Sequence, residues 1–184
     1  MPYSKAHQVE IVIGSKSDEP KLEEAGVFEI IKGAGLTWGL SVCSAHRNDH
    51  DLTNLCTQFM HQAKTTRAII AVAGKAAALP GAIAAKMQGP NAPFVLAVAL
   101  STGDFYDDQA AVLATLCLPD GCNVFGCGRD KAGLKTAAMM ACKLLGESNR
   151  DVAARLWNSL SGQRKQAEIH YRTSETEMEK EKKL

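Results

Sequence analysis

The side chains best suited to chemistry stand together in one short run, Ser44-Ala45-His46-Arg47. An imidazole titrates near neutral pH and is the commonest general acid or base in enzymes, so His46 can take up and release a proton. The guanidinium of Arg47 offers a planar fork of donors that suits a phosphate group. The run therefore predicts a proton-transfer group beside an anion-binding group. A surface turn with an incidental histidine and arginine is the alternative.

A second small and polar segment contains Gly14, Ser15, Ser17 and Asp18. Glycine lets a ligand approach the backbone closely, and serine hydroxyls at the start of a helix can help to bind phosphate. Asp18 can cap the helix that follows, accept hydrogen bonds from ribose hydroxyls, or do both. An ordinary strand-to-helix connection has a similar composition, so this segment by itself does not define a site.

The third segment combines Gly74 and Lys75 with three alanines at residues 76–78. A segment with so few large side chains can accommodate a flat heterocycle against its main chain. Close packing of a helix on a sheet also requires alanine and is the alternative. Lys75 is either solvated or the cation that holds a carboxylate or carbon dioxide in a pocket.

All three segments follow apolar runs that are typical of strands, at residues 9–13, 40–43 and 68–73. Further strands are predicted at 93–99 and 123–127, and helices at 19–34, 48–64, 79–87, 109–117 and 130–145. This alternation predicts an α/β fold of three layers with a mainly parallel sheet. Since ligands bind beyond the carboxyl ends of such strands, we expect the three segments to form one pocket.

Composition excludes several classes of protein. The formal net charge of the 184 residues is +1, and no basic stripe stands out before the C-terminal tail, so we expect no nucleic-acid partner. No apolar run approaches the roughly 20 residues of a membrane helix. Residues 1–8 have no apolar core of a secretory signal. We therefore expect a cytoplasmic protein that does not bind a membrane.

Metal-ligand spacing is also missing from the sequence. No two of the six cysteines have the C-x2-C spacing of a zinc site, and most stand among apolar neighbours, which predicts buried, reduced thiols. His46 and His50 are four residues apart but have no evident third ligand. We therefore expect no metal site.

The pattern changes after Gly146. Val152, Leu156 and Leu160 recur at helical spacing, and a charged tail follows. We divide the chain into a nucleotide-binding α/β catalytic domain, residues 1–150, and a C-terminal helix with a charged tail, residues 151–184. We expect this extension to pack between subunits, with packing on its own subunit as the alternative.

Together the segments resemble the aminoimidazole ribonucleotide carboxylase/mutase family of purine biosynthesis (PurE), over residues 8–146. The likeness rests on Gly14-Ser15-x-Ser17-Asp18, on Ser44-Ala45-His46-Arg47, and on residues 76–86, which contain Leu79-Pro80-Gly81. The resemblance implies a flavodoxin-like subunit that assembles into a homo-octamer and uses no metal or organic cofactor. The implied ligands are aminoimidazole ribonucleotide, its carboxylated derivatives and carbon dioxide.

The resemblance also implies roles for single residues. His46 would move the proton at C4 of the substrate's imidazole ring. Lys75 departs from the family, and we expect it to be a second catalytic residue because its ammonium group can hold a carboxylate or carbon dioxide. Asp18 would bind the ribose hydroxyls. The phosphate would be bound by hydroxyls and a guanidinium, those of Ser17, Ser44 and Arg47. The remaining substrate-binding residues line the turns or lie against the ring: Gly14, Ser15, Ala45, Ala73, Gly74 and Leu79.

Two positions decide which reaction the resemblance favours. Bacterial mutases of the family usually carry glycine at the position of Lys75 and histidine at that of Ala78, whereas the branch that uses carbon dioxide directly carries arginine at the first and lacks that histidine. Leu79-Pro80-Gly81 is typical of the mutases. Because Lys75 replaces the glycine of the mutases and Ala78 replaces their histidine, we nevertheless expect carboxylation or decarboxylation at C4 of aminoimidazole ribonucleotide. The alternatives are the N5-carboxyaminoimidazole ribonucleotide mutase reaction and a member of the family that binds nucleotide without catalysis.

Overall fold

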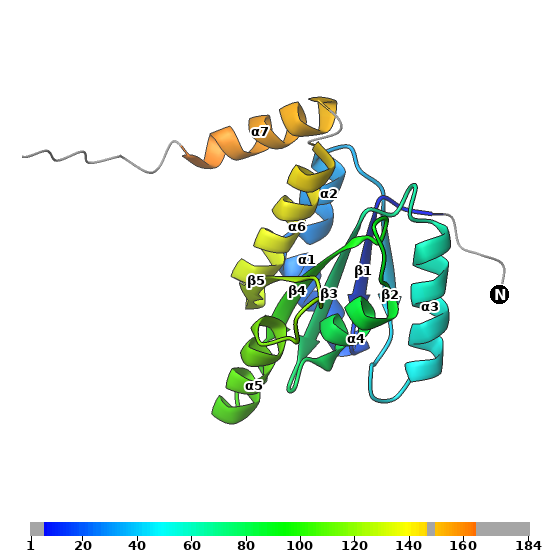
Figure 1. Cartoon of the computed structure of the whole chain (residues 1–184). Helices are drawn as coiled ribbons and strands as arrows, with labels where there is room; N and C mark the ends of the chain where they lie inside the picture. Colours follow the sequence, from blue (N-terminus) through cyan, green and yellow to red (C-terminus); the bar gives the residue numbers. More distant parts are fainter. Residues whose placement is uncertain (1–5, 147–149, 165–184) are drawn as a thin grey trace, which may run out of the picture.

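The fold is a sheet of parallel strands between two layers of helices (Figure 1). The computed structural model describes residues 6–146 and 150–164. The strands are β1 (Val9–Ile13), β2 (Trp38–Val42), β3 (Ala68–Gly74), β4 (Phe94–Leu100) and β5 (Val124–Arg129). A short 3-10 helix, η1 (Lys16–Asp18), precedes the helices α1 (Glu19–Ala25), α2 (Val27–Gly33), α3 (Asp49–His61), α4 (Ala78–Lys86), α5 (Phe105–Leu116), α6 (Asp130–Gly146) and α7 (Arg150–Arg164).

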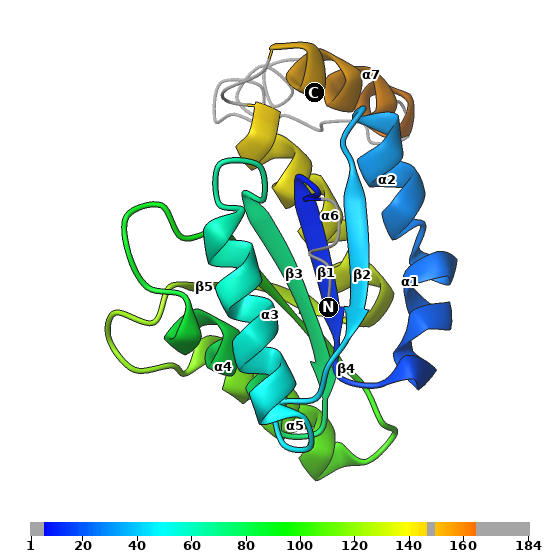
Figure 2. The same cartoon turned by 90° about the vertical axis from the view of Figure 1, so that its right-hand side faces the viewer.

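The strand order is β2-β1-β3-β4-β5, and every neighbouring pair is parallel. This is the doubly wound order of flavodoxin-like folds, so the predicted fold class is confirmed. Figure 2 shows β1, β2 and β3 running side by side in one direction. Their carboxyl ends therefore meet at one edge of the sheet.

Each face of the sheet has its own apolar core. Ile11 and Ile13 of β1 point to the face covered by α1, α2 and α6, whereas Val12 points to the face covered by α3 and α4. The central strands β3 and β4 are buried along almost their whole length, because helices cover them on both sides. This explains why these strands read as continuous apolar runs rather than as alternating patterns.

Two helices differ most clearly from the predicted pattern, while α3, α4 and α6 lie within three residues of their predicted bounds. The single helix predicted over residues 19–34 is divided into α1 and α2 at Gly26, which has a φ of 71° and so ends the first helix in the left-handed region. Helix α5 begins at Phe105, four residues before the predicted start. Its N-terminus is capped by Asp104, whose carboxylate accepts hydrogen bonds from the backbone N–H groups of Tyr106 (2.9 Å) and Asp107 (3.0 Å).

Helix α7 packs on its own subunit through its first two turns. Val152 and Leu156 are buried in the core cluster that α2 and α6 share. The predicted charged tail at residues 165–184 lies outside the described residues, and contact of the extension with a neighbouring subunit stays a prediction. No helix in residues 6–146 and 150–164 is long and apolar enough to cross a membrane.

The cysteines correct one expectation. All six are free thiols, but only Cys43, Cys56, Cys127 and Cys142 are buried, while Cys122 is half-buried and Cys117 is exposed. Burial raises the pKa of Cys56 to about 11 and that of Cys142 to about 12. Burial hides these two sulfur atoms from solvent, and the raised pKa keeps them in the unreactive thiol form.

We therefore expect a thiol reagent to modify two cysteines quickly in the native protein. Cys117 and Cys122 lie within reach of solvent, whereas the other four require unfolding to react. Titration with a chromogenic disulfide reagent before and after adding denaturant measures both groups. The double variant C117S/C122S is the control and should show no fast phase; a fast phase in that variant would contradict the fold.

Candidate active site

One cavity of about 580 Å³ is lined by all twelve residues that the sequence analysis selected. It lies at the carboxyl ends of β1, β2 and β3. The twelve are Gly14, Ser15, Ser17, Asp18, Ser44, Ala45, His46, Arg47, Ala73, Gly74, Lys75 and Leu79. The structure thus brings the three segments together as the strand order requires, and the role of each residue stays a proposal.

Backbone hydrogen bonds hold the segments in register where the strands end. The N–H of Gly14 donates to the carbonyl oxygen of Val72 (3.1 Å), and the N–H of Cys43 donates to that of Ile13 (2.9 Å). The first residues after β1 and β2 are therefore fixed relative to β3. This places the serine segment between the histidine segment and the glycine turn.

The serine segment places the carboxylate of Asp18 in the wall of the cavity. The hydroxyls of Ser15 and Ser17 hydrogen-bond each other (2.9 Å). Asp18 occupies the predicted N-cap position of α1, but its side chain makes no capping hydrogen bond. Its nearest cation is Lys21, with Nζ 3.8 Å from Oδ1. Burial raises the pKa of Asp18, and Lys21 together with a hydrogen bond from the Ser15 backbone partly opposes the effect.

His46 and Arg47 stand in the turn between β2 and α3. The turn is closed by the N–H of Asn48, which donates to the carbonyl oxygen of Ser44 (3.0 Å). Both side chains are exposed, and neither is engaged in a hydrogen bond or ion pair across the described ranges 6–146 and 150–164. An imidazole and a guanidinium are thus available to a ligand in the cavity.

The glycine turn is strained. Lys75 has a φ of 53° and Ala77 a φ of 39°, both in the left-handed region that residues with a Cβ rarely adopt. The N–H of Ala77 donates to the carbonyl oxygen of Gly74 (3.0 Å), which closes the turn. At Gly74 a Cβ would lie 3.1 Å from the carbonyl oxygen of Leu100, so the close approach of β4 favours glycine there. Strained backbone of this kind is often found where a ligand binds.

Sequence reasoning missed four lining residues: Ala76, Ala77, Ala78 and Thr102. The three alanines were recognised as small but were not assigned to the site. Thr102 is the second residue after β4 and reaches the cavity for the same reason as the other segments. The rule that ligands bind beyond the carboxyl ends of parallel strands would have found it, had it been applied to the fourth strand.

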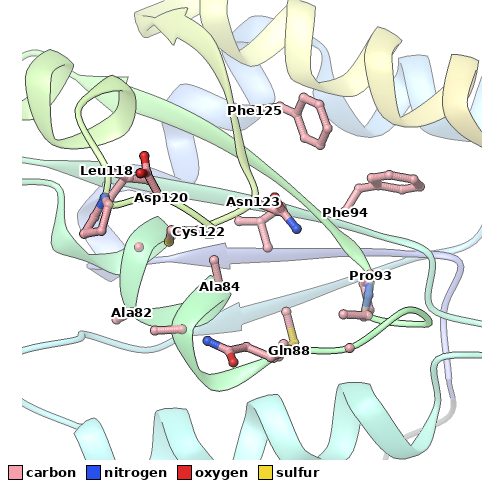
Figure 3. A pocket seen from close by; sticks show the side chains of 18 of the residues that line it. Ala82, Ala84, Gln88, Pro93, Phe94, Leu118, Asp120, Cys122, Asn123 and Phe125 are labelled. Carbon is pink, nitrogen blue, oxygen red and sulfur yellow. The ribbon is translucent and has the colours of Figure 1, made fainter.

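A larger groove of about 1440 Å³ lies between α4 and the segment that joins α5 to β5 (Figure 3). Phe94 and Phe125 stand together at one side of it, with ring centroids 5.9 Å apart. The groove shares Ala76 and Ala78 with the smaller cavity but has no histidine, serine or threonine in its wall. We therefore place the chemistry in the smaller cavity, which combines an imidazole, a guanidinium, a carboxylate and an ammonium group.

In the described part of the chain no three metal-binding side chains form a group that could hold an ion.

Comparison with known proteins decides the family. The family model described as AIR carboxylase matches residues 8–166. The chain belongs to the AIR carboxylase family. Among its relatives, the N5-carboxyaminoimidazole ribonucleotide mutase of Aliivibrio fischeri is 32% identical over 147 residues, which cover 80% of this chain and 86% of the relative. The mutase of the same name from Escherichia coli strain K12 is 34% identical, over 81% of this chain and 83% of the relative.

A solved structure of the family has the same fold. The crystal structure of Treponema denticola PurE superposes with a TM-score of 0.73, covering 85% of this chain and 91% of that one, at 19% sequence identity. The match confirms the flavodoxin-like architecture of the AIR carboxylase family for this chain. Membership of this enzyme family also confirms the resemblance that the three motifs indicated.

The raised pKa of Asp18 predicts that this carboxylate destabilises the folded protein at neutral pH. A group that binds its proton more tightly when folded lowers the stability as pH rises from its unfolded pKa through its folded one. We therefore expect Asp18→Asn to raise the melting temperature at pH 7 and to leave it unchanged below about pH 3.5, where both forms are protonated. Denaturation curves of both proteins between pH 3 and 8 make the comparison.

The neighbouring carboxylate Glu19 provides the control, because it lies outside the cavity. Glu19→Gln should not reproduce the effect. A lower stability of Asp18→Asn at pH 7 would show that the carboxylate supports the fold, and would contradict this reading of the site.

Proposed function

We propose that this protein is a mutase that moves a carboxyl group from N5 to C4 of a 5-aminoimidazole ribonucleotide. The observation that carries the proposal is the single cavity in which the serine segment, the Ser-Ala-His-Arg run and the glycine turn meet. The curated relatives described above are named for this reaction, which supports the mutase over the direct carboxylation that Lys75 led us to expect.

The cavity has a suitable group for each part of such a nucleotide. The phosphate would bind Arg47 and the hydroxyls of Ser17 and Ser44, because a guanidinium and hydroxyl donors match its oxygens. Asp18, whose side chain makes no capping bond to α1, would accept hydrogen bonds from the ribose hydroxyls. The ring would lie on the small side chains and backbone of Ala45, Ala73, Gly74 and Leu79, with Gly14 and Ser15 lining the turn beside the sugar.

The chemistry requires one proton to be moved. When the bond between N5 and the carboxyl group breaks, C4 of the electron-rich ring can form a bond to the carbon dioxide released. C4 then carries both hydrogen and carboxylate, and aromaticity returns only when a base removes that hydrogen. His46 would take this proton, which can then be returned to the nitrogen that lost its carboxyl group. An exposed imidazole without a protein partner is suited to both steps.

Direct exchange of carbon dioxide with solution is the second candidate function. Two residues of the cavity wall favour it. Lys75 provides an ammonium group, and Ala78, at the position where mutases usually have histidine, has a methyl group that can neither donate nor accept a proton. A cation can hold a carboxylate or polarise carbon dioxide near the ring.

We further propose that the chain is cytoplasmic, that it forms a homo-octamer, and that residues 1–150 bear the catalytic unit while residues 151–184 contribute to subunit contacts.

Isotope tracing separates the two reactions. The protein is incubated with 4-carboxyaminoimidazole ribonucleotide in labelled bicarbonate, and with the N5-carboxy isomer labelled in its carboxyl group. We expect label to be retained from N5 to C4 with little incorporation from solution. Rapid entry of label from bicarbonate would establish the carboxylase instead. Binding of the nucleotide without turnover of either isomer would indicate a member of the family that does not catalyse, and the proposal would be wrong.

Substitution of His46 tests the proton transfer. His46→Asn should lower kcat by at least about 100-fold, the usual contribution of a general acid–base residue, while nucleotide binding changes little. His50→Asn is the matched control, since His50 lies one turn further along outside the cavity and should leave kcat unchanged. Turnover of His46→Asn at the rate of the parent protein would remove His46 from the mechanism.

Substitution of Lys75 tests the choice of reaction without damaging the fold. Glycine adopts a φ of 53° without strain and Lys75 is exposed, so Lys75→Gly should melt at the same temperature or higher. For a mutase we expect kcat to stay within about threefold, because the transferred group never leaves the cavity. Loss of carbon dioxide exchange together with all turnover would instead assign Lys75 to direct carboxylation.

A further inference from the structure

A polar cluster lies behind the cavity, where β4 and β5 end, and has no part in the reaction proposed above. It consists of Ser101, Thr102, Asp108, Arg129 and Asp130. Asp130 directly follows β5 and adopts a φ of 49°, which is costly for a residue other than glycine. The cluster therefore holds its conformation against backbone strain.

Two carboxylates each capture a backbone N–H group of the same loop. Asp130 accepts hydrogen bonds from the N–H of Ser101 (2.7 Å) and from its hydroxyl (2.5 Å). Asp108 accepts one from the N–H of Thr102 (2.7 Å). Successive residues of the β4–α5 connection are thus tied to two different helices, α5 and α6.

Arg129 joins the two carboxylates. Its Nε donates to Oδ2 of Asp130 (3.1 Å), its second guanidinium nitrogen donates to the hydroxyl of Ser101 (2.6 Å), and that nitrogen lies 3.7 Å from Oδ2 of Asp108. Burial by itself would raise the pKa of Asp130, but the hydrogen bonds from Ser101 and Arg129 lower it. The carboxylate is therefore held in its charged form, which makes the stronger hydrogen bonds.

The loop that this cluster holds touches the cavity on two sides. Thr102 lines the cavity, and its methyl group lies 3.4 Å from the position that a Cβ on Gly74 would take. On the other side, the carbonyl oxygen of Ser101 accepts a hydrogen bond from Lys21 (3.4 Å), whose ammonium group is the cation nearest Asp18. A shift of this loop would therefore change the packing at Gly74 in the glycine turn and the position of Lys21 beside Asp18.

We propose that Arg129, Asp130 and Asp108 form a clamp that positions the Ser101–Thr102 loop and thereby the ligand-binding wall of the cavity. All three are positioning residues, since none of them lines the cavity itself. Through the clamp, the carboxyl end of β4 becomes part of the site. The inference rests on the proposed function only for the choice of nucleotide in one of its two tests.

Asp130→Gly is the sharpest probe, because glycine removes the carboxylate and also accepts the left-handed backbone. We expect a melting temperature within about 3 °C of the parent protein. Hydrogen exchange should become faster at residues 100–104 and also at residues 74–79, which contain no residue of the clamp. The Kd for 4-carboxyaminoimidazole ribonucleotide should rise about tenfold, because the loop that carries Thr102 would spend only a fraction of its time in the binding position, with kcat within about threefold.

Three further variants complete the test. Asp130→Asn keeps an acceptor for the Ser101 N–H and should give a smaller effect. Ser101→Ala removes one hydroxyl of the clamp and provides the same measurements should Asp130→Gly fail to fold. Lys131→Ala is the matched control: it breaks the adjacent surface ion pair with Glu24 (3.1 Å), which does not touch the loop, and should change neither exchange nor Kd.

The outcomes are distinct. Faster exchange confined to residues 100–104, with unchanged exchange at 74–79 and unchanged Kd, would show a local structural role and overturn the proposal. If the parent protein does not bind the nucleotide, the proposed function falls, and hydrogen exchange still decides whether the clamp controls the glycine turn.

Discussion

The in-register pairing of β1 with β2 and β3 is the constraint on which the rest of the structure depends. Ile13 at the end of β1 is opposite Val42 of β2 and Val72 of β3, so the three strands reach the same edge together. A shift of one residue in any strand would turn its apolar side chains to the opposite face and displace the segment that follows. The two apolar cores thus fix the register, and the register fixes the cavity.

Small side chains make that cavity possible and also impose its strain. The turn after β3 passes so close to β4 that Gly74 has little room for a side chain, and the chain then turns through two left-handed residues, Lys75 and Ala77. A conformation of this kind survives only where the surrounding structure outweighs its cost. Here β3 and the burial of Ala77 and Leu79 against the sheet hold the turn in place.

The charged and polar side chains inside the cavity differ from those outside it in how many protein partners they have. Inside the cavity, His46, Arg47 and Lys75 have no partner among the described residues, and the carboxylate of Asp18 is partly buried with a raised pKa. Outside it, Arg129, Asp108 and Asp130 satisfy one another and the backbone of the β4–α5 loop. The three groups that have no partner among the described residues line the cavity, and the paired groups lie behind its wall. This division is typical of a preorganised site, in which the supporting shell is rigid.

Much of this could be predicted from the sequence, because strand patterns and polar turns are local properties. The apolar runs determine five strands, and the rule that ligands bind beyond their carboxyl ends brings residues 14–18, 44–47 and 73–79 to one edge. All twelve selected residues line the cavity for that reason. The tertiary structure alone decided that Thr102 enters the wall, because Asp130, at the end of β5, and Asp108, in α5, hold the loop that carries it. The break of the first helix at Gly26 and the missing capping bond of Asp18 are local details that the apolar pattern does not specify. Local patterns carry no information about the contact between Ser101 and Asp130, since these residues are 29 positions apart in the chain and meet only when the sheet has formed.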